Sequence, residues 1–400
     1  MKPIYKILAL LCYFSIGLCT PVQTLLMCEH GCTLQNVGLT FTIFAVTVII
    51  AEIPSGVFAD LRGRRLSFIL SRVMEAASAA MLIVSDSFWL SAAAFATAGF
   101  AVAFASGSLD ALAVEDAVRR GGKGAMTKAV SQFSVCQCAG VACGALAAGF
   151  IPYVPGYALH LEWKCALSLL TAVVSFALPE DVRKPSDGGG RIKLGEHIGR
   201  VSSLLRQSSA IKVAVVCIAA TVTVQTAVET YWQPRFVEIN GGAGQGALGV
   251  LMASSYIAST GGCALMGLAD LKDESRRWKT YLLLSAGFAF AEASLSFISS
   301  SLLFSALYVA AFLLIGLLTV PEQTIINAEA TDDVRATVLS VTSFAARVGA
   351  MVSGTLGSLL LLAGNVAFVW RVMALLAFAG LAAAYVMRRA SSGKDREATM

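Results

Sequence analysis

Charged side chains are scarce in this sequence of 400 residues. Asp, Glu, Lys and Arg make up 14% of it, against roughly 25% in soluble domains, whereas 57% of the residues are hydrophobic and the mean hydropathy is +0.74. Too few charges are present to cover a water-facing surface of this size. The composition therefore excludes an ordinary soluble domain and indicates that most of the surface faces lipid.

Histidine is rarer still, with three residues in the chain. His30, His160 and His197 all fall in predicted loops, and neither a His-Glu-x-x-His nor a Cys-x-x-Cys spacing occurs, so we expect no metal centre, no cofactor and no enzyme activity. Eight of the ten cysteines lie in or beside apolar segments, where cysteine acts as a small hydrophobe. Cys28 and Cys32 flank His30, and their spacing leaves open a disulfide, a metal clip or two free thiols.

Long apolar runs dominate what remains. A membrane-spanning helix needs about 20 predominantly apolar residues, and the sequence predicts twelve of them. They cover 5–28, 37–58, 67–85, 88–113, 126–150, 161–179, 210–233, 246–268, 280–298, 301–320, 337–362 and 366–387. The first run resembles a signal peptide, but its apolar core is longer than the usual ~7–15 residues, so we keep it as a helix.

The basic residues predict the orientation, because loops on the cytoplasmic side carry an excess of Lys and Arg. With both termini inside, 26 of the 30 basic residues, Arg72 among them, fall on that side. The four left are Lys164, Arg235, Arg347 and Arg371. This asymmetry accounts for the net charge of +5 without a nucleic-acid partner.

The longest polar stretch divides the chain into four parts. We expect a six-helix bundle in 1–180, a cytoplasmic linker in 181–209, a second six-helix bundle in 210–390 and a cytoplasmic tail in 391–400. The linker contains a Gly-rich run and then 192–205, where apolar residues recur at helical spacing, which predicts a helix on the membrane surface.

A repeated junction supports the division into two halves. Gly56, Asp60, Gly63, Arg64 and Arg65 follow the second apolar run, and a similar junction containing Asp270 follows the eighth, 210 residues later. Internal duplication of this kind is typical of secondary transporters. In the second copy the turn glycine is missing, so we expect its contacts to be weaker.

These residues carry a resemblance to a known family. The pattern Gly56-x-x-x-Asp60-x-x-Gly63-Arg64-Arg65, in a chain with twelve apolar runs, resembles the signature of the major facilitator superfamily. The resemblance covers nearly the whole chain. It implies an all-α integral membrane fold with two pseudo-symmetric six-helix bundles.

The resemblance also implies a gating latch on the cytoplasmic side. Asp60 would accept hydrogen bonds from the N-terminus of the eleventh predicted helix, 337–362, where the helix dipole is positive. Gly56 and Gly63 would allow close approach and a tight turn, and Arg64 and Arg65 would pair with Glu115 or Asp116 or mark the inner face.

Ionisable side chains within apolar runs are usually functional. The acids are Glu52, Glu75, Asp110, Glu229 and Glu292, and Arg347 is the one deep base predicted. For Glu75, with Arg72 three residues earlier, and for Glu292 we expect a structural salt bridge or a buried protonated acid. We expect Asp110 and Glu229 to be buried and to exchange protons. Glu52 lies in the stretch before the junction that is similar in the resembling family, or it stabilises the bend at Pro54.

A polar stripe marks the seventh apolar run. Thr221, Gln225, Glu229 and Gln233 recur every four residues, and Trp232 beside them offers an aromatic face for a cation. Arg347 and its repeat counterpart Gln137 would face each other across the central cavity, by resemblance.

The sequence thus predicts a monomeric, proton-coupled secondary transporter of the inner (cytoplasmic) membrane that exports a small amphipathic or cationic compound. One alternative is an uptake carrier in which Arg347 anchors an anionic metabolite; another is a membrane sensor on a transporter scaffold. Proton coupling lacks two features that the family often shows, because Ala105 stands where an arginine is common and no proline follows Gly140 or Gly144.

Overall fold

The computed structural model describes residues 1–400 except 123–124, 180–207, 242–243, 330–334 and 399–400. The described chain is entirely helical, and each of the twelve predicted apolar runs falls on helix. The predicted surface helix in 192–205 lies outside the described residues. The chain divides into two compact units, Met1–Gly189 with Asn240–Ile257 (unit 1) and Gly190–Ile239 with Ala258–Met400 (unit 2).

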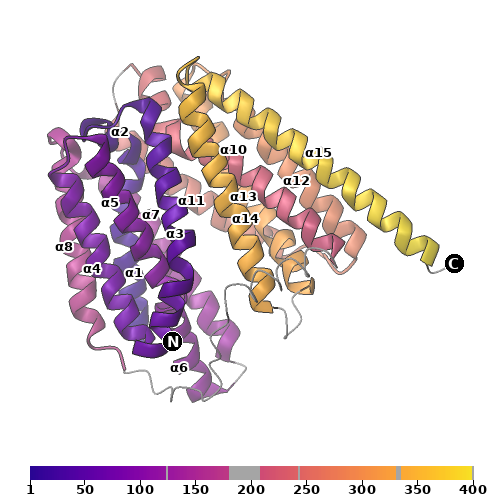
Figure 1. Cartoon of the computed structure of the whole chain (residues 1–400), viewed down its shortest axis with the longest axis horizontal. Coiled ribbons are helices and arrows are strands. Elements are labelled where there is room, and N and C mark those ends of the chain that lie inside the picture. The colour runs from indigo at the N-terminus through magenta and orange to yellow at the C-terminus, as the bar shows by residue number, and fades with distance from the viewer. Residues whose placement is uncertain (123–124, 180–207, 242–243, 330–334, 399–400) are drawn as a thin grey trace. The chain divides into compact units, whose positions relative to one another are not determined.

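Unit 1 contains the helices drawn from indigo to pink in Figure 1. They are α1 (Pro3–Cys19), η1 (Thr20–Val22), α2 (Gln23–Glu29), α3 (Leu34–Arg62), α4 (Arg64–Ile83), α5 (Phe88–Ala105), α6 (Leu109–Gly121), α7 (Ala125–Phe150), η2 (Pro155–Tyr157) and α8 (Ala158–Ser175). Helix α1 packs on α7 and α8, and α4 packs on α5 and α8. One cluster of its core includes Tyr5, Leu8, Phe68, Leu112 and Phe133.

Unit 2 contains α10 (Ser209–Ile239), α12 (Glu274–Leu295), α13 (Ser301–Glu329), α14 (Arg335–Leu360) and α15 (Val366–Ala398). Helix α10 packs on α14 and α15, and α12 packs on α13. One cluster of its core includes Ile211, Ile218, Ile326, Val338 and Val341. Helix α11 (Gln245–Gly267) belongs to unit 1 up to Ile257 and to unit 2 from Ala258.

Ten spans in the described residues are long and apolar enough to cross a membrane. Two other long helices, α8 and α12, are not among these ten; α8 contains Glu162 and Lys164, and α12 begins at Glu274 and contains Glu292. Large apolar side chains such as Leu268 (86% exposed) and Phe150 (82% exposed) lie on the surface, which suits lipid better than water. The fold is therefore an all-α, multi-pass membrane protein.

Two predicted segments are interrupted, each at an identifiable residue. The first passes through the short 3-10 helix η1, where Pro21 has no N–H to donate. The fourth breaks between α5 and α6 at Gly107, whose φ of 64° is left-handed. The break places Asp110 in the first turn of α6.

Close helix packing in unit 1 depends on the glycines of α7. A Cβ built at Gly140 would lie 2.8 Å from the Cβ of Tyr13, and one at Gly144 would lie 2.3 Å from the carbonyl oxygen of Phe14. Both distances are below any that real side chains show. Helices α1 and α7 can therefore pack at this distance because Gly140 and Gly144 carry no side chain.

Candidate functional site

The first junction is a turn of one residue. Helix α3 ends at Arg62, α4 begins at Arg64, and Gly63 between them has φ 90° and ψ 147°. This conformation is essentially restricted to glycine. Gly56 is different, because a Cβ built there has open space and the close approach expected of it is not made within unit 1.

The charged residues of this junction divide into two groups. Arg64 donates to Glu115 (Nη1 to Oε1, 2.6 Å), and Arg65 donates to the carbonyl oxygen of Leu178 (3.1 Å). Of the two acids offered as partners for these arginines, Glu115 meets Arg64, whereas Asp116 is held by Lys2 (3.1 Å), Arg119 (3.4 Å) and Arg120. The reason is geometric, since Arg119 and Arg120 lie one helical turn from Asp116 on the same helix.

Asp60, the predicted latch residue, is exposed at the end of α3 and has no side-chain partner within the part of the chain that the structure describes. Asp270 in the second junction accepts the backbone N–H of Lys272 (3.2 Å), and Asp273 caps α12 by accepting from the N–H of Arg276 (2.6 Å). The second copy thus forms a local turn in which Asp270 fixes its own loop.

The loop of Cys28 and Cys32 resolves into two free thiols around a buried histidine. His30 Nδ1 lies 3.0 Å from the carbonyl oxygen of Ser85, and Nε2 lies 2.6 Å from that of Gly156. Each ring nitrogen therefore lies against a backbone carbonyl oxygen, a position that a metal ion would have to occupy to bind His30.

Three of the predicted intramembrane acids are not buried. Glu52, Asp110 and Glu229 are exposed in the structure, so the expectation that Asp110 and Glu229 are buried is wrong. The break at Gly107 explains Asp110, which begins a new helix. Glu229 accepts a hydrogen bond from Gln225 (Nε2 to Oε1, 2.9 Å), as their four-residue spacing allows.

Unit 1 contains largely buried basic side chains that the sequence did not predict. Lys164, one of the four basic residues not assigned to the cytoplasmic side, reaches from α8 to Glu75 on α4 (Nζ to Oε1, 2.7 Å). Arg72, expected on the cytoplasmic side, is 3% exposed within α4 and donates to Cys12 and Ser71. Glu75 therefore forms the predicted salt bridge, but with Lys164, and Arg347 is not the one deep base.

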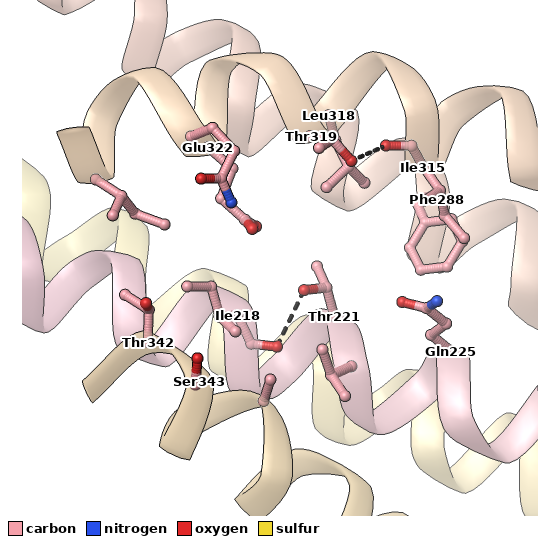
Figure 2. A pocket seen from close by; sticks show the side chains of 14 residues that line it. Ile218, Thr221, Gln225, Phe288, Ile315, Leu318, Thr319, Glu322, Thr342 and Ser343 are labelled. Atoms are coloured by element: carbon pink, nitrogen blue, oxygen red, sulfur yellow. Dashed lines mark hydrogen bonds between the residues drawn. The ribbon is translucent and has the colours of Figure 1, made fainter. Parts of the chain in front are cut away.

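The cavity of about 250 Å³ inside unit 2 is bounded by α10, α12, α13 and α14. Figure 2 shows Glu322 on α13 across an open space from Thr221 on α10, with Gln225 below Phe288 at the right and with Thr342 and Ser343 on α14 at the lower left. The polar lining also includes Thr319 and Gln323, and Glu322 is the one ionisable residue among those that line the cavity. Glu322 Oε2 accepts from the hydroxyl of Tyr281 (2.8 Å).

Only one end of the predicted polar stripe on α10 lines this cavity. Thr221 and Gln225 line it, Glu229 is hydrogen-bonded to Gln225, and Gln233 is buried at 2% exposure. Trp232 was expected in a substrate site, but it is 1% exposed and stacked on Tyr308 (centroids 4.8 Å apart). Trp232 is thus a packing residue of unit 2.

Gln137 and Arg347 belong to different units. Gln137 donates to the hydroxyl of Tyr13 within unit 1, and Arg347 is half-buried on α14. Glu292 is 1% exposed, and its Oε2 has no hydrogen-bond partner among the described residues.

Glu322 and Tyr281 are the residues of the cavity that sequence reasoning missed. The predicted apolar run ended at residue 320, just before Pro321 and Glu322, whereas α13 continues to Glu329. The available signal was the repeat, because Glu322 lies 212 residues after Asp110, close to the 210-residue offset between the two junctions. Among the described residues, no group of three or more His, Cys, Asp or Glu is placed to hold a metal ion.

A multi-pass helical membrane protein with a polar cavity inside a helix bundle has the architecture of a membrane transporter. Residues 7–272 match the model of the Major Facilitator Superfamily, and the chain belongs to this superfamily. No curated protein sequence matches significantly.

Solved transporter structures share the fold at low identity. The nucleoside transporter NupG has 13% sequence identity and a TM-score of 0.76, covering 96% of this chain and 98% of its own. A bacterial homologue of the human lysosomal transporter Spinster has 14% identity and a TM-score of 0.71 (97% and 98% covered). The POT family transporter PepTSo has 12% identity and a TM-score of 0.69 (96% and 97% covered).

Proposed function

We propose that this superfamily member is a proton-coupled secondary transporter that exports a small cationic or polar amphipathic compound. The observation that carries this proposal is the unit 2 cavity, where hydroxyl and amide groups surround a single carboxylate, Glu322. Such a site offers many hydrogen bonds and one negative charge.

The charge of the lining sets the substrate class. No Lys or Arg contributes to the lining, so an anion would enter against Glu322 without a counter-charge. A cation would be neutralised by Glu322, and the ring of Phe288 adds an apolar, aromatic wall. The cavity therefore supports export of a cation more than the alternative in which Arg347 anchors an anion.

Competition at one carboxylate supplies a simple coupling mechanism. A carboxyl group holds either a proton or a cationic substrate, since protonation removes the charge that the substrate needs. Proton entry at Glu322 from outside would displace the substrate, and substrate entry from inside would displace the proton. Glu229, joined to the cavity through Gln225, is the second candidate for the proton path.

The orientation follows the basic residues, with both termini and the Asp60 junction on the cytoplasmic side of the inner membrane. Asp60 is unpaired among the described residues of its unit, which suits a latch that engages another part of the chain during the transport cycle. We place the working unit as a monomer. An intact turn at Gly63 argues against the sensor alternative, since a static scaffold has little need of a latch.

A nucleoside is the second candidate substrate. The amides of Gln225 and Gln323 and the hydroxyls of Thr319 and Thr342 match the donors and acceptors of a base and a ribose. NupG, which shares the fold, is a nucleoside transporter. Against it stands the carboxylate of Glu322, which a neutral nucleoside does not need.

Accumulation in cells tests the proposal. Cells expressing the wild type or Asp60→Ala are loaded with a panel of lipophilic cations, nucleosides, amino acids and carboxylates, with and without a protonophore. We expect protonophore-sensitive depletion of a cation in the wild type and loss of that depletion in Asp60→Ala. Glu322→Gln should also lose it, and Glu162→Gln, which removes an exposed carboxylate of α8, is the matched control. Equal depletion in Glu322→Gln and wild type would reject the cavity as the site.

A further inference from the structure

Unit 1 contains a second cavity, of about 190 Å³, whose lining differs in charge from that of unit 2. Arg72, Glu75 and Lys164 line it together. Its apolar walls include Phe41, Phe44 and Phe95. Nothing in the proposed transport mechanism uses this cavity.

The charges in this cavity do not balance. Lys164 and Glu75 form one ion pair at 2.7 Å, with side chains 16% and 8% exposed. Arg72 is a third charge, 3% exposed, and no carboxylate lies within ion-pair distance of it among the residues that the structure describes. Two cations and one anion leave a net charge of +1.

Arg72 is also short of hydrogen-bond acceptors. A guanidinium has five N–H donors. Those of Arg72 have two acceptors in the described chain: the hydroxyl of Ser71 (from Nε, 3.1 Å) and the Sγ of Cys12 (from Nη1, 3.0 Å). Thiol sulfur is a weak acceptor, and the ring of Phe68 5.4 Å away adds a cation–π contact that fills no N–H.

A buried cation without a counter-ion is costly, and a bound anion removes that cost. A carboxylate fits best, because its two oxygens match the planar fork of a guanidinium. The phenylalanine walls fit an apolar body attached to that carboxylate. At roughly 30 Å³ for one water molecule, the cavity has room for about six waters, or for one small organic acid.

We propose that the unit 1 cavity binds a small monocarboxylate, with the carboxylate on Arg72 and its apolar body against Phe41, Phe44 and Phe95. The site is independent of the proposed export function. Binding at the unit 1 site depends on Arg72, whereas the proposed export site depends on Glu322.

Benzoate is the probe, with the purified full chain in detergent and chloride-free buffer. We expect benzoate to raise the unfolding temperature in a saturable manner, by at least about 2 °C near saturation. Benzyl alcohol and benzylamine, which have a similar ring without the negative charge, should leave it unchanged. An equal rise with chloride would overturn the proposal in favour of an inorganic anion site, and no rise with benzoate would overturn it outright.

Variants test the assigned contacts by equilibrium dialysis of radiolabelled benzoate. Arg72→Gln should weaken binding at least about tenfold, because it removes a charge-assisted pair, and Arg72→Lys should retain part of the affinity. Arg276→Gln, which removes an exposed arginine of α12, should bind as the wild type does. Unchanged affinity in Arg72→Gln would reject the site.

Ala98→Leu provides a test that leaves the charges in place, in case Arg72→Gln does not fold. Ala98 lines the cavity, so a larger side chain there fills the space for the ring. We expect Ala98→Leu to abolish stabilisation by benzoate. Full stabilisation in this variant would place benzoate elsewhere.

Discussion

The ion pair between Lys164 and Glu75 allows a quantitative prediction, because three charges share one buried space. The wild type has a net charge of +1 there, from Lys164, Arg72 and Glu75. Glu75→Gln raises it to +2, Lys164→Met lowers it to 0, and the double variant restores +1. Removing one partner of a buried pair costs about 3–5 kcal/mol, since the other charge is left uncompensated.

The two single variants should differ for a structural reason. After Lys164→Met, Glu75 still has Arg72 one turn away on α4, and the guanidinium can turn to meet it. After Glu75→Gln, Lys164 and Arg72 have no counter-charge. We therefore expect about 3–5 kcal/mol for Glu75→Gln, less for Lys164→Met, and a cost for the double variant well below the sum of the two.

Denaturant unfolding of the full chain in micelles, without benzoate or chloride, measures these free energies. Glu162→Gln on α8 should change stability by less than about 0.5 kcal/mol, because Glu162 is exposed. Equal costs for the two single variants, or full additivity in the double variant, would refute the electrostatic explanation of this cluster.

Three further predictions concern the junction and the loops. Gly63→Ala should destabilise unit 1 by about 1–3 kcal/mol, because φ 90° and ψ 147° strain any other residue. Gly56→Ala should leave the stability of unit 1 unchanged. Equal melting temperatures of the two variants would contradict this prediction. His30→Ala should speed amide exchange in the segments of Ser85 and Gly156, because it removes the imidazole ring whose nitrogens lie 3.0 and 2.6 Å from their carbonyl oxygens. Unchanged exchange would show that these contacts are not structural. The hydrogen bond that Tyr153 donates to Glu29 raises the pKa of the Tyr153 phenol. This hydrogen bond is therefore intact below the usual tyrosine pKa of about 10, and it is lost only as the pH rises through the raised pKa. A spectroscopic titration that subtracts Tyr153→Phe should give a midpoint above 10, and a midpoint at or below 10 would contradict the assignment.

The sequence predicted the helices because length and apolarity alone decide whether a segment can span a membrane. It predicted the turn at Gly63 for a similar reason, since only glycine adopts that conformation. Both features depend on residues close together in the chain. Neither requires knowledge of which helices pack together.

The contacts between helices could not be predicted in this way. Lys164 was not counted among the deep bases, because nothing near it in the sequence shows that α8 packs on α4 beside Glu75. Glu322 was left out of the predicted site, and it lies beyond the predicted apolar run, which ended just before Pro321. In a membrane helix, however, neighbouring groups can satisfy the backbone around a proline, so α13 continues past it.

Proton flux in proteoliposomes is the most direct test of proton-coupled export through the unit 2 cavity. The purified protein is reconstituted with a pH-sensitive dye inside, and the cation identified in cells is added outside. We expect the cation to drive proton movement in the opposite direction, and we expect Glu322→Gln to abolish both the proton movement and the cation transport while Glu162→Gln retains them. Cation transport without proton movement, at the same rate in Glu322→Gln as in the wild type, would contradict the account.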